Sequence, residues 1–133
     1  MLERLFIVVF IITAFVAAYY LFKYWQLKQV QAQAKLGDAL MNEIPEGQSA
    51  ILYFTAEWCS VCKLQQQPAM QQFIAENPNV KVVTIDIEVM PEVAQRWHIL
   101  SLPTTIILDK KHVPIAMNHG AVSARKLAQQ LKG

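Results

Sequence analysis

The chain has 133 residues, of which 54 % are apolar and only 17 % are charged. This composition excludes a disordered chain, and the length allows about one globular domain, which excludes a multidomain enzyme. Residues 1–35 carry four Lys or Arg against one Glu, whereas residues 36–133 carry eight Lys or Arg against nine Asp or Glu. The globular part therefore has no basic excess, and nucleic acid is not an expected partner.

Residues 1–22 are predicted to form a transmembrane anchor. Between Leu5 and Phe22, 17 of 18 residues are apolar. As a helix this run spans about 27 Å at 1.5 Å per residue, close to the roughly 30 Å of a bilayer core. A cleaved signal peptide is the alternative, since Val16-Ala17-Ala18 resembles a cleavage site. The apolar run continues past that site, which favours an anchor within the lipid bilayer.

Residues 23–37 are predicted to form a helical juxtamembrane connector. The segment from Tyr24 to Leu36 contains no Gly or Pro, and Leu27, Val30 and Ala34 form a narrow apolar stripe. One interpretation is an extension that lifts the domain off the membrane; the other is a docking stripe for a partner membrane protein. Gly37-Asp38 is the expected break, after which residues 38–133 form the globular domain.

The domain alternates strands with helices. The expected strands and helices, in chain order, are strand Ala50–Thr55, helix Lys63–Glu76, strand Val80–Ile87, helix Pro91–Trp97, strands Thr104–Leu108 and Val113–Met117, and helix Ser123–Leu131. Ser123 is a predicted N-cap. This order indicates an α/β fold with a mixed central sheet and helices on both faces, preceded by one transmembrane helix.

The helix predicted over Lys63–Glu76 has two further features. Pro68 is expected to kink it. Leu64, Met70, Phe73 and Ile74 are expected to supply its apolar contacts, while its glutamines, including Gln66, cover an exposed face.

The two cysteines are separated by two residues, directly after the first buried strand and at the start of a helix. A helix N-terminus stabilises a thiolate, which is the nucleophile in disulfide exchange. Cys59 is therefore the expected attacking thiol and Cys62 the resolving thiol. A structural disulfide and a metal site are the alternatives, but the loop is very short and the histidines show no ligand spacing. We expect no metal and no cofactor.

The segment Ala56-Glu57-Trp58-Cys59-Ser60-Val61-Cys62-Lys63 resembles the active-site signature of the thioredoxin superfamily. Ser101-Leu102-Pro103-Thr104 resembles the cis-proline loop of that family, and Asn118-His119-Gly120-Ala121 its glycine segment before the last helix. The resemblance covers residues 38–133. It implies that Trp58 shields the thiols, that Pro103 is cis and lies against the disulfide, and that the Leu102 backbone is presented to an extended substrate.

The chain departs from that family at two buried positions. Many thioredoxins place an Asp six residues before the first Cys, where Tyr53 stands here, and its Lys partner matches Thr84. Both members of the pair are absent together, which avoids an unpaired buried charge. We expect water, Glu57 or the Tyr53 hydroxyl to take the proton of Cys62. Ser60-Val61 also replaces the familiar Gly-Pro, so the redox potential does not carry over.

The resemblance implies a membrane-anchored thiol–disulfide oxidoreductase that reduces or exchanges protein disulfides. Its partners would be protein thiols and disulfides, the lipid bilayer and a membrane protein complex. The alternative is an accessory or assembly subunit that uses the thioredoxin scaffold for docking; an isomerase is a third, weaker interpretation. The count of Lys23, Lys28 and Lys35 against Arg4 favours a cytoplasmic domain, whereas anchored relatives often face outward, so these two indications oppose each other.

Overall fold

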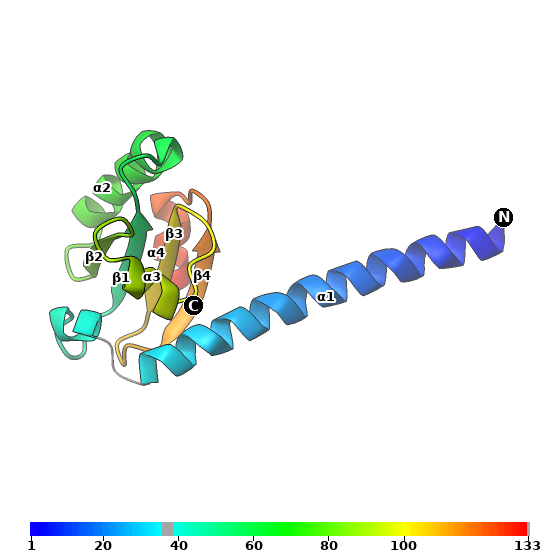
Figure 1. Cartoon of the computed structure of the whole chain (residues 1–133), viewed down its shortest axis with the longest axis horizontal. Helices are drawn as coiled ribbons and strands as arrows, with labels where there is room; N and C mark the ends of the chain where they lie inside the picture. Colours follow the sequence, from blue (N-terminus) through cyan, green and yellow to red (C-terminus); the bar gives the residue numbers. More distant parts are fainter. Residues whose placement is uncertain (36–38, 133) are drawn as a thin grey trace.

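The computed structural model describes residues 1–35 and 39–132 (Figure 1). The predicted break at Gly37-Asp38 lies outside the described residues. In chain order the elements are α1 (Leu2–Lys35), the 3-10 helix η1 (Ala39–Glu43), β1 (Ala50–Thr55), the π-helical turn η2 (Cys62–Gln66), α2 (Gln67–Glu76), β2 (Lys81–Asp86), α3 (Pro91–Arg96), β3 (Thr104–Leu108), β4 (Pro114–His119) and α4 (Ala124–Lys132).

The four strands form one mixed sheet in the order β2-β1-β3-β4. β1 pairs in parallel with β2, and β3 is antiparallel to both β1 and β4. The parallel pair needs a crossover, which η2 and α2 supply, whereas β3 and β4 are joined by a short turn. All four strands lie within one or two residues of the predicted ranges, and the predicted mixed α/β sheet is confirmed.

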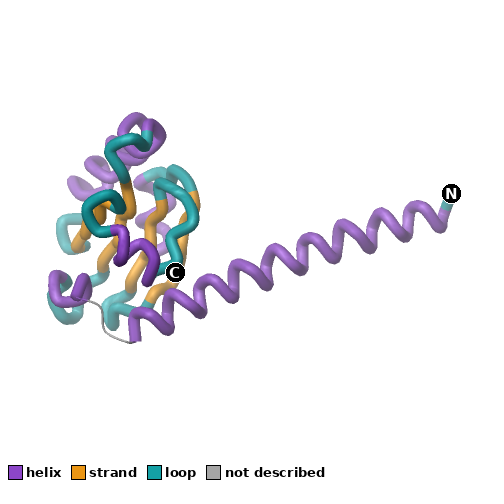
Figure 2. Tube along the Cα trace, in the orientation of Figure 1, coloured by secondary structure: helices purple, strands orange, loops and turns teal. Residues whose placement is uncertain are grey.

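Helices cover both faces of this sheet (Figure 2). Successive strand residues point to opposite faces. On one face, Leu52 and Phe54 of β1 pack in a core cluster with Trp97. On the other, Ile51 packs in a second cluster with Phe73 of α2 and Leu127 of α4. The two-faced arrangement predicted from the alternation of strands and helices is therefore confirmed.

Helix α1 has two parts with different surroundings. Its N-terminal part projects away from the domain (Figure 1), and every side chain from residue 2 to residue 25 is exposed. Its C-terminal part packs against the edge strand β4. Val30 is fully buried in the same cluster as Leu52 and Phe54, which stabilises this contact by about 1.5–3 kcal/mol. Gln31 Nε2 donates a hydrogen bond to the Pro114 carbonyl oxygen at 2.9 Å.

This packing changes the interpretation of the apolar stripe. Val30 contacts the chain's own domain, so it is neither part of a free spacer nor a surface open to a partner protein. The side chain of Ala34, the third member of the predicted stripe, lies outside the described residues.

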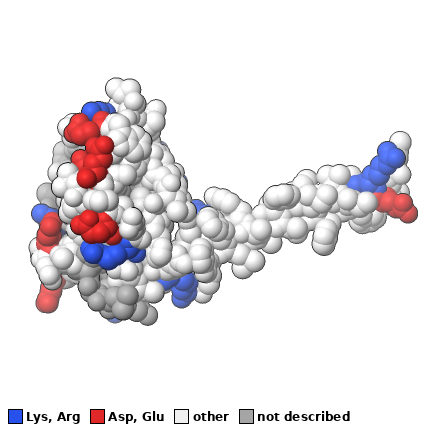
Figure 3. Space-filling model, viewed as in Figure 1, with Lys and Arg blue, Asp and Glu red and all other residues white. Residues whose placement is uncertain are grey.

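The N-terminal part of α1 is long and apolar enough to cross a membrane. The candidate span is Leu2–Gln33, which extends into the docked part, but the most apolar 18-residue window within it has no buried residue. A signal sequence near the N-terminus would meet the same requirement of length and composition. The charged side chains gather at the two ends of the projecting segment, and its middle carries none (Figure 3).

The helix after the cysteines departs from regular α-helical form, and its burial differs from the prediction. Pro68 lies inside a continuous helical run, in the first turn of α2 and directly after the π-helical turn η2. Met70 and Phe73 are buried as predicted, but Leu64 and Ile74 are exposed and Gln66 is fully buried.

Candidate active site

The cysteines lie where β1 ends and the next helix begins. The Cys59 amide donates to the Ala56 carbonyl oxygen at 3.1 Å, a turn that connects the strand to the helix. Cys59 and Cys62 form a disulfide with their Cα atoms 5.3 Å apart. Their side chains are almost fully buried, with 6 % of Cys59 and 1 % of Cys62 exposed.

One backbone N–H group at the helix start points toward the first sulfur. The Cys62 amide donates to Cys59 Sγ at 3.2 Å. In the reduced protein the same donor, together with the positive end of the helix dipole, favours a thiolate on Cys59. The geometry therefore supplies the asymmetry between an attacking and a resolving thiol.

The loop before β3 forms one wall of the site. Ala56, Cys59 and Cys62 form a small apolar cluster, against which Leu102 and Ile87 pack. The Leu102–Pro103 peptide bond is cis, as predicted. The Pro103 carbonyl oxygen accepts a hydrogen bond from the Gly120 amide at 2.8 Å, so the segment after β4 supports this loop.

The outer rim of the site is apolar and open to solvent. Trp58 is 65 % exposed, although it lies next to a buried cysteine. Further exposed apolar side chains lie at the start of the helix and in the loop before Pro103: Val61, Leu64 and Leu100. Exposed apolar side chains next to a reactive group are typical of a surface that contacts another protein.

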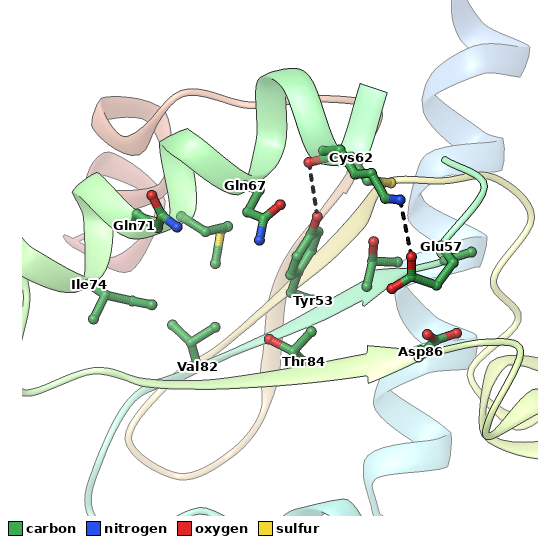
Figure 4. Close-up of a pocket in the computed structure, with 13 residues that line it drawn as sticks. Tyr53, Glu57, Cys62, Gln67, Gln71, Ile74, Val82, Thr84 and Asp86 are labelled. Carbon is green, nitrogen blue, oxygen red and sulfur yellow. Dashed lines mark hydrogen bonds and ion pairs between the residues drawn. The ribbon is translucent and has the colours of Figure 1, made fainter. Parts of the chain in front are cut away.

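The inner side of the site is a pocket of about 280 Å³ between η2, α2 and the edge strand β2 (Figure 4). Cys62, Tyr53 and Thr84 are among its lining residues. Tyr53 and Thr84 are neighbours across the parallel strand pair, so the two positions that differ from many thioredoxins lie side by side. The Tyr53 hydroxyl is directed at the Cys62 carbonyl oxygen, at 3.5 Å, rather than at the sulfur.

Carboxylates line the mouth of this pocket. Glu57 forms an ion pair with Lys63 at 3.1 Å and remains mostly exposed. Asp86, at the end of β2, also lines the pocket (Figure 4); the sequence analysis did not single it out. Among the described residues, 1–35 and 39–132, no group of three or more His, Cys, Asp or Glu side chains is placed to hold a metal ion.

Gln66 is a supporting residue that the sequence analysis missed. Its Oε1 accepts a hydrogen bond from the Val122 amide at 2.9 Å, and its Nε2 donates to the Val122 carbonyl oxygen at 3.2 Å. Both polar groups of a buried glutamine are thus satisfied, and the dithiol turn is joined to the segment before α4. Its spacing from Met70 and Phe73, four and seven residues, places it on the inner face and was the available signal.

The thioredoxin family model matches residues 29–133. The chain belongs to the thioredoxin family. It is 35 % identical over 82 residues to thioredoxin 2 of Plasmodium berghei, covering 62 % of this chain and about half, 52 %, of that protein. It is 31 % identical over 86 residues to the thioredoxin of Chlamydia trachomatis, covering 64 % of this chain and 78 % of that one.

The fold similarity extends to solved thioredoxins. The oxidised form of mitochondrial thioredoxin 3 from Saccharomyces cerevisiae superposes with a TM-score of 0.61 at 27 % identity, covering 70 % of this chain and 85 % of that one. Membership of the thioredoxin family and the Cys59–Cys62 pair together support thiol–disulfide oxidoreductase activity.

Proposed function

We propose that this thioredoxin-family chain is a membrane-anchored thiol–disulfide oxidoreductase that reduces or exchanges protein disulfides through Cys59 and Cys62. The observation that carries the proposal is the position of the dithiol. The two sulfurs lie at a helix N-terminus, beside a cis-proline loop and below an exposed apolar rim that includes Trp58.

The proposed reduction has two exchange steps. The Cys59 thiolate attacks one sulfur of the substrate disulfide, so that a mixed disulfide forms and the other substrate sulfur leaves as a thiolate. The Cys62 thiolate then attacks Cys59 Sγ, which forms the Cys59–Cys62 disulfide and releases the second substrate sulfur. The two protons of the dithiol pass to the two substrate sulfurs, and the two electrons go with them. Exchange in the opposite direction follows the same steps reversed.

Proton transfer from Cys62 is proposed to run through water in the inner pocket. Cys62 lines this pocket together with Glu57 and Asp86, and the Tyr53 hydroxyl is already directed at a carbonyl oxygen. This arrangement favours Glu57 or Asp86 over Tyr53 as the group that takes the Cys62 proton through water before the proton passes to the released substrate sulfur. Because water must intervene, exchange should be slower than in a thioredoxin with a buried Asp. Stopped-flow reduction of a model disulfide by both proteins tests this, and equal rates would refute it.

The proposed anchor is the exposed apolar part of α1, residues 1–22. An apolar helix of this length is not stable in water with its surface exposed, so it needs lipid or another protein around it. The packing of Val30 on the sheet, and a family match that begins at residue 29, favour counting the last turns of α1 with the domain rather than with a connector over 23–37.

Single cysteine substitutions test the proposed chemistry. Cys59→Ser should abolish reduction of a peptide disulfide, because no nucleophile remains. Cys62→Ser should instead accumulate a mixed disulfide with the substrate, visible by non-reducing electrophoresis. Met117→Leu is the matched control, since this side chain is partly buried away from the sulfurs, and it should keep full activity. The oxidoreductase proposal would be wrong if Cys59→Ser retained activity. It would also be wrong if, in cells carrying this variant, a membrane complex assembled normally and the substrate thiols stayed reduced.

Labelling in intact cells tests the anchor and its orientation. A membrane-impermeant thiol reagent, applied before and after reduction, reports which side Cys59 faces and whether the pair is oxidised. Extraction of the chain from membranes by alkaline carbonate would contradict a spanning anchor.

A further inference from the structure

The short segment after β4, residues 120–122, connects the dithiol with the projecting helix. On one side it supports the active site, since the Gly120 amide bonds to the Pro103 carbonyl oxygen and the Val122 backbone bonds to Gln66. On the other side, Ala121 and Val122 line a groove of about 260 Å³. The opposite wall of that groove includes Tyr19 and Phe22 of α1.

Tyr19 and Phe22 belong to the last turn of the apolar run. The segment 120–122 shares a groove with these two side chains. It therefore lies at the same level along the α1 axis as the C-terminal end of the proposed membrane span. Gln26 Oε1 and His119 Nε2 are hydrogen-bonded at 3.1 Å, only about 6 Å further along the helix axis than Phe22. Since His119 ends β4, the active-site end of the sheet is the end nearest the membrane.

The opposite end of the sheet is farther away. β1 starts at Ala50 and runs toward the cysteines, so the turn at 45–48 before it lies at the other end (Figure 1). An anchor over residues 1–22 would thus hold the dithiol nearer to the bilayer than the turn at 45–48.

The groove has the chemistry of a surface that meets lipid headgroups. It continues into a second groove of about 470 Å³, and both are lined by Lys23, Lys126 and His119. Among the described residues that line the two grooves, none is Asp or Glu. Tyr19, Tyr20 and Tyr24 also line them, and tyrosine favours the membrane interface. Positive charge beside aromatic rings is complementary to anionic headgroups.

We propose that this edge of the domain rests on the headgroup layer, so that the substrates of the dithiol are disulfides of membrane proteins that lie at the bilayer surface. This inference rests on the proposed function and adds the substrate class. The exchange steps are those given above. Because α1 is docked on β4, Cys59 is held at one distance from the bilayer surface. A flexible tether would instead let it reduce disulfides at many distances from that surface.

The test uses the full chain in nanodiscs of phosphatidylcholine and phosphatidylglycerol, reduced with dithiothreitol and freed of excess reductant. One substrate is a single-span peptide with a disulfide-closed loop directly outside its span. A second carries the same loop on a Gly-Ser spacer of about 20 residues, roughly 25 Å in mean reach, and a third is the loop free in solution. Single-turnover reduction is followed by thiol alkylation and mass shift. A peptide whose loop lies on the opposite face of the disc from the domain is not reduced. Mixed peptide orientation therefore lowers the amplitude of the reduction but leaves its rate unchanged.

The matched variants change only how the domain is mounted. One carries a Gly-Ser insertion of about 12 residues between Tyr24 and Trp25, which leaves the Gln26, Val30 and Gln31 contacts in place. The control carries the same insertion between Glu46 and Gly47, in the turn at the far end of the sheet.

The unmodified chain and the control should reduce the surface loop at least tenfold faster than the raised loop. The variant with the insertion after Tyr24 should lose that preference while reducing the free loop at an unchanged rate. Equal rates on surface and raised loops in the unmodified chain would overturn the inference, as would an undiminished preference in the variant. Failure to reduce even the free loop would instead overturn the oxidoreductase proposal, and this inference with it. The preference should also fall in discs of phosphatidylcholine alone; if it does not, the headgroup contact is wrong.

Discussion

The two parts of α1 belong to one uninterrupted helix but bury their apolar side chains in different ways. Val16 in the projecting part is 48 % exposed, whereas Val30 in the docked part is fully buried in the protein core. The docked part also carries Gln26 and Gln31, whose side chains bond to β4. The projecting part carries a run of apolar residues on every face, which fits a lipid surround.

This difference shows that a helix pattern has to be interpreted together with its surroundings. The projecting part is apolar on every face and needs lipid around it. The docked part buries one valine between two glutamines, and the edge strand β4 is enough to cover that face. The boundary between the two parts falls between Phe22, which is exposed, and Gln26, which is buried.

Removing residues 2–22 should have the largest effect. The shortened chain should leave the membrane fraction completely, because the whole proposed span is gone, while its free energy of unfolding changes by less than about 0.5 kcal/mol. Removing residues 2–33 should in addition cost about 3 kcal/mol, since it deletes Val30 and the hydrogen bonds of Gln26 and Gln31. Membrane flotation and denaturant unfolding measure the two effects. Equal stability of the two truncated chains would mean that the dock contributes nothing.

An aspartate at two matched valines should separate the two kinds of burial. Val30→Asp places a carboxylate in the core cluster and should lower the free energy of unfolding of the domain by at least about 3 kcal/mol. Val16→Asp should leave domain unfolding unchanged and instead disfavour membrane insertion by about 2.5–3.5 kcal/mol. Denaturant unfolding in micelles and an insertion assay measure these effects. Similar domain stabilities for the two variants would contradict the assignment.

Gln31→Ala should have a smaller effect. It removes the donor to the Pro114 carbonyl oxygen and should cost about 1–2 kcal/mol, because a partly buried acceptor loses its partner. Gln29→Ala, at a half-buried position two residues earlier, is the control and should change stability by less than about 0.5 kcal/mol. Hydrogen exchange of the β4 amides reports the loss locally. An unaltered exchange rate would show that the Gln31 hydrogen bond does not stabilise the dock.

Much of this fold follows from local patterns in the sequence. The strands Ala50–Thr55 and Thr104–Leu108 are short apolar runs, and both were predicted at their observed bounds. Ser123 was predicted as an N-cap, and its Oγ accepts from the Lys126 amide at 3.2 Å. These features depend only on residues near each other in the chain.

The errors concern contacts between distant residues. Val30 meets β strands that begin 20 residues later, so its spacing on the helix could not tell a partner protein from the chain's own sheet. Gln66 was expected on an exposed face because glutamine is usually solvated, yet the backbone of Val122, 56 residues away, satisfies both its polar groups. The Cys-x-x-Cys and cis-proline motifs located the site, but the pocket beside Cys62 depends on how β2 packs against α2.

Lys23→Gln should have the smallest effect, and it tests the boundary between the two parts of α1. Partial burial and then the positive charge of Lys23 lower the pKa of His119 below its ordinary value of 6.5. Removing that charge should raise the pKa of His119, which NMR titration of the imidazole measures. His98 and His112 in the same sample are internal controls. Lys28→Gln is the matched variant, because Lys28 also lies over a tyrosine ring but does not contribute to the His119 shift.

The same shift links His119 to stability. Because its pKa is lower in the folded chain, the unfolded chain binds more protons as the pH falls below about 6.5, and the free energy of unfolding decreases there. Lys23→Gln should weaken this dependence, and Lys28→Gln should not. If the pKa of His119 were the same in all three chains, Lys23 would lie away from the active-site end of the sheet, and the junction between helix and domain would have to be placed elsewhere.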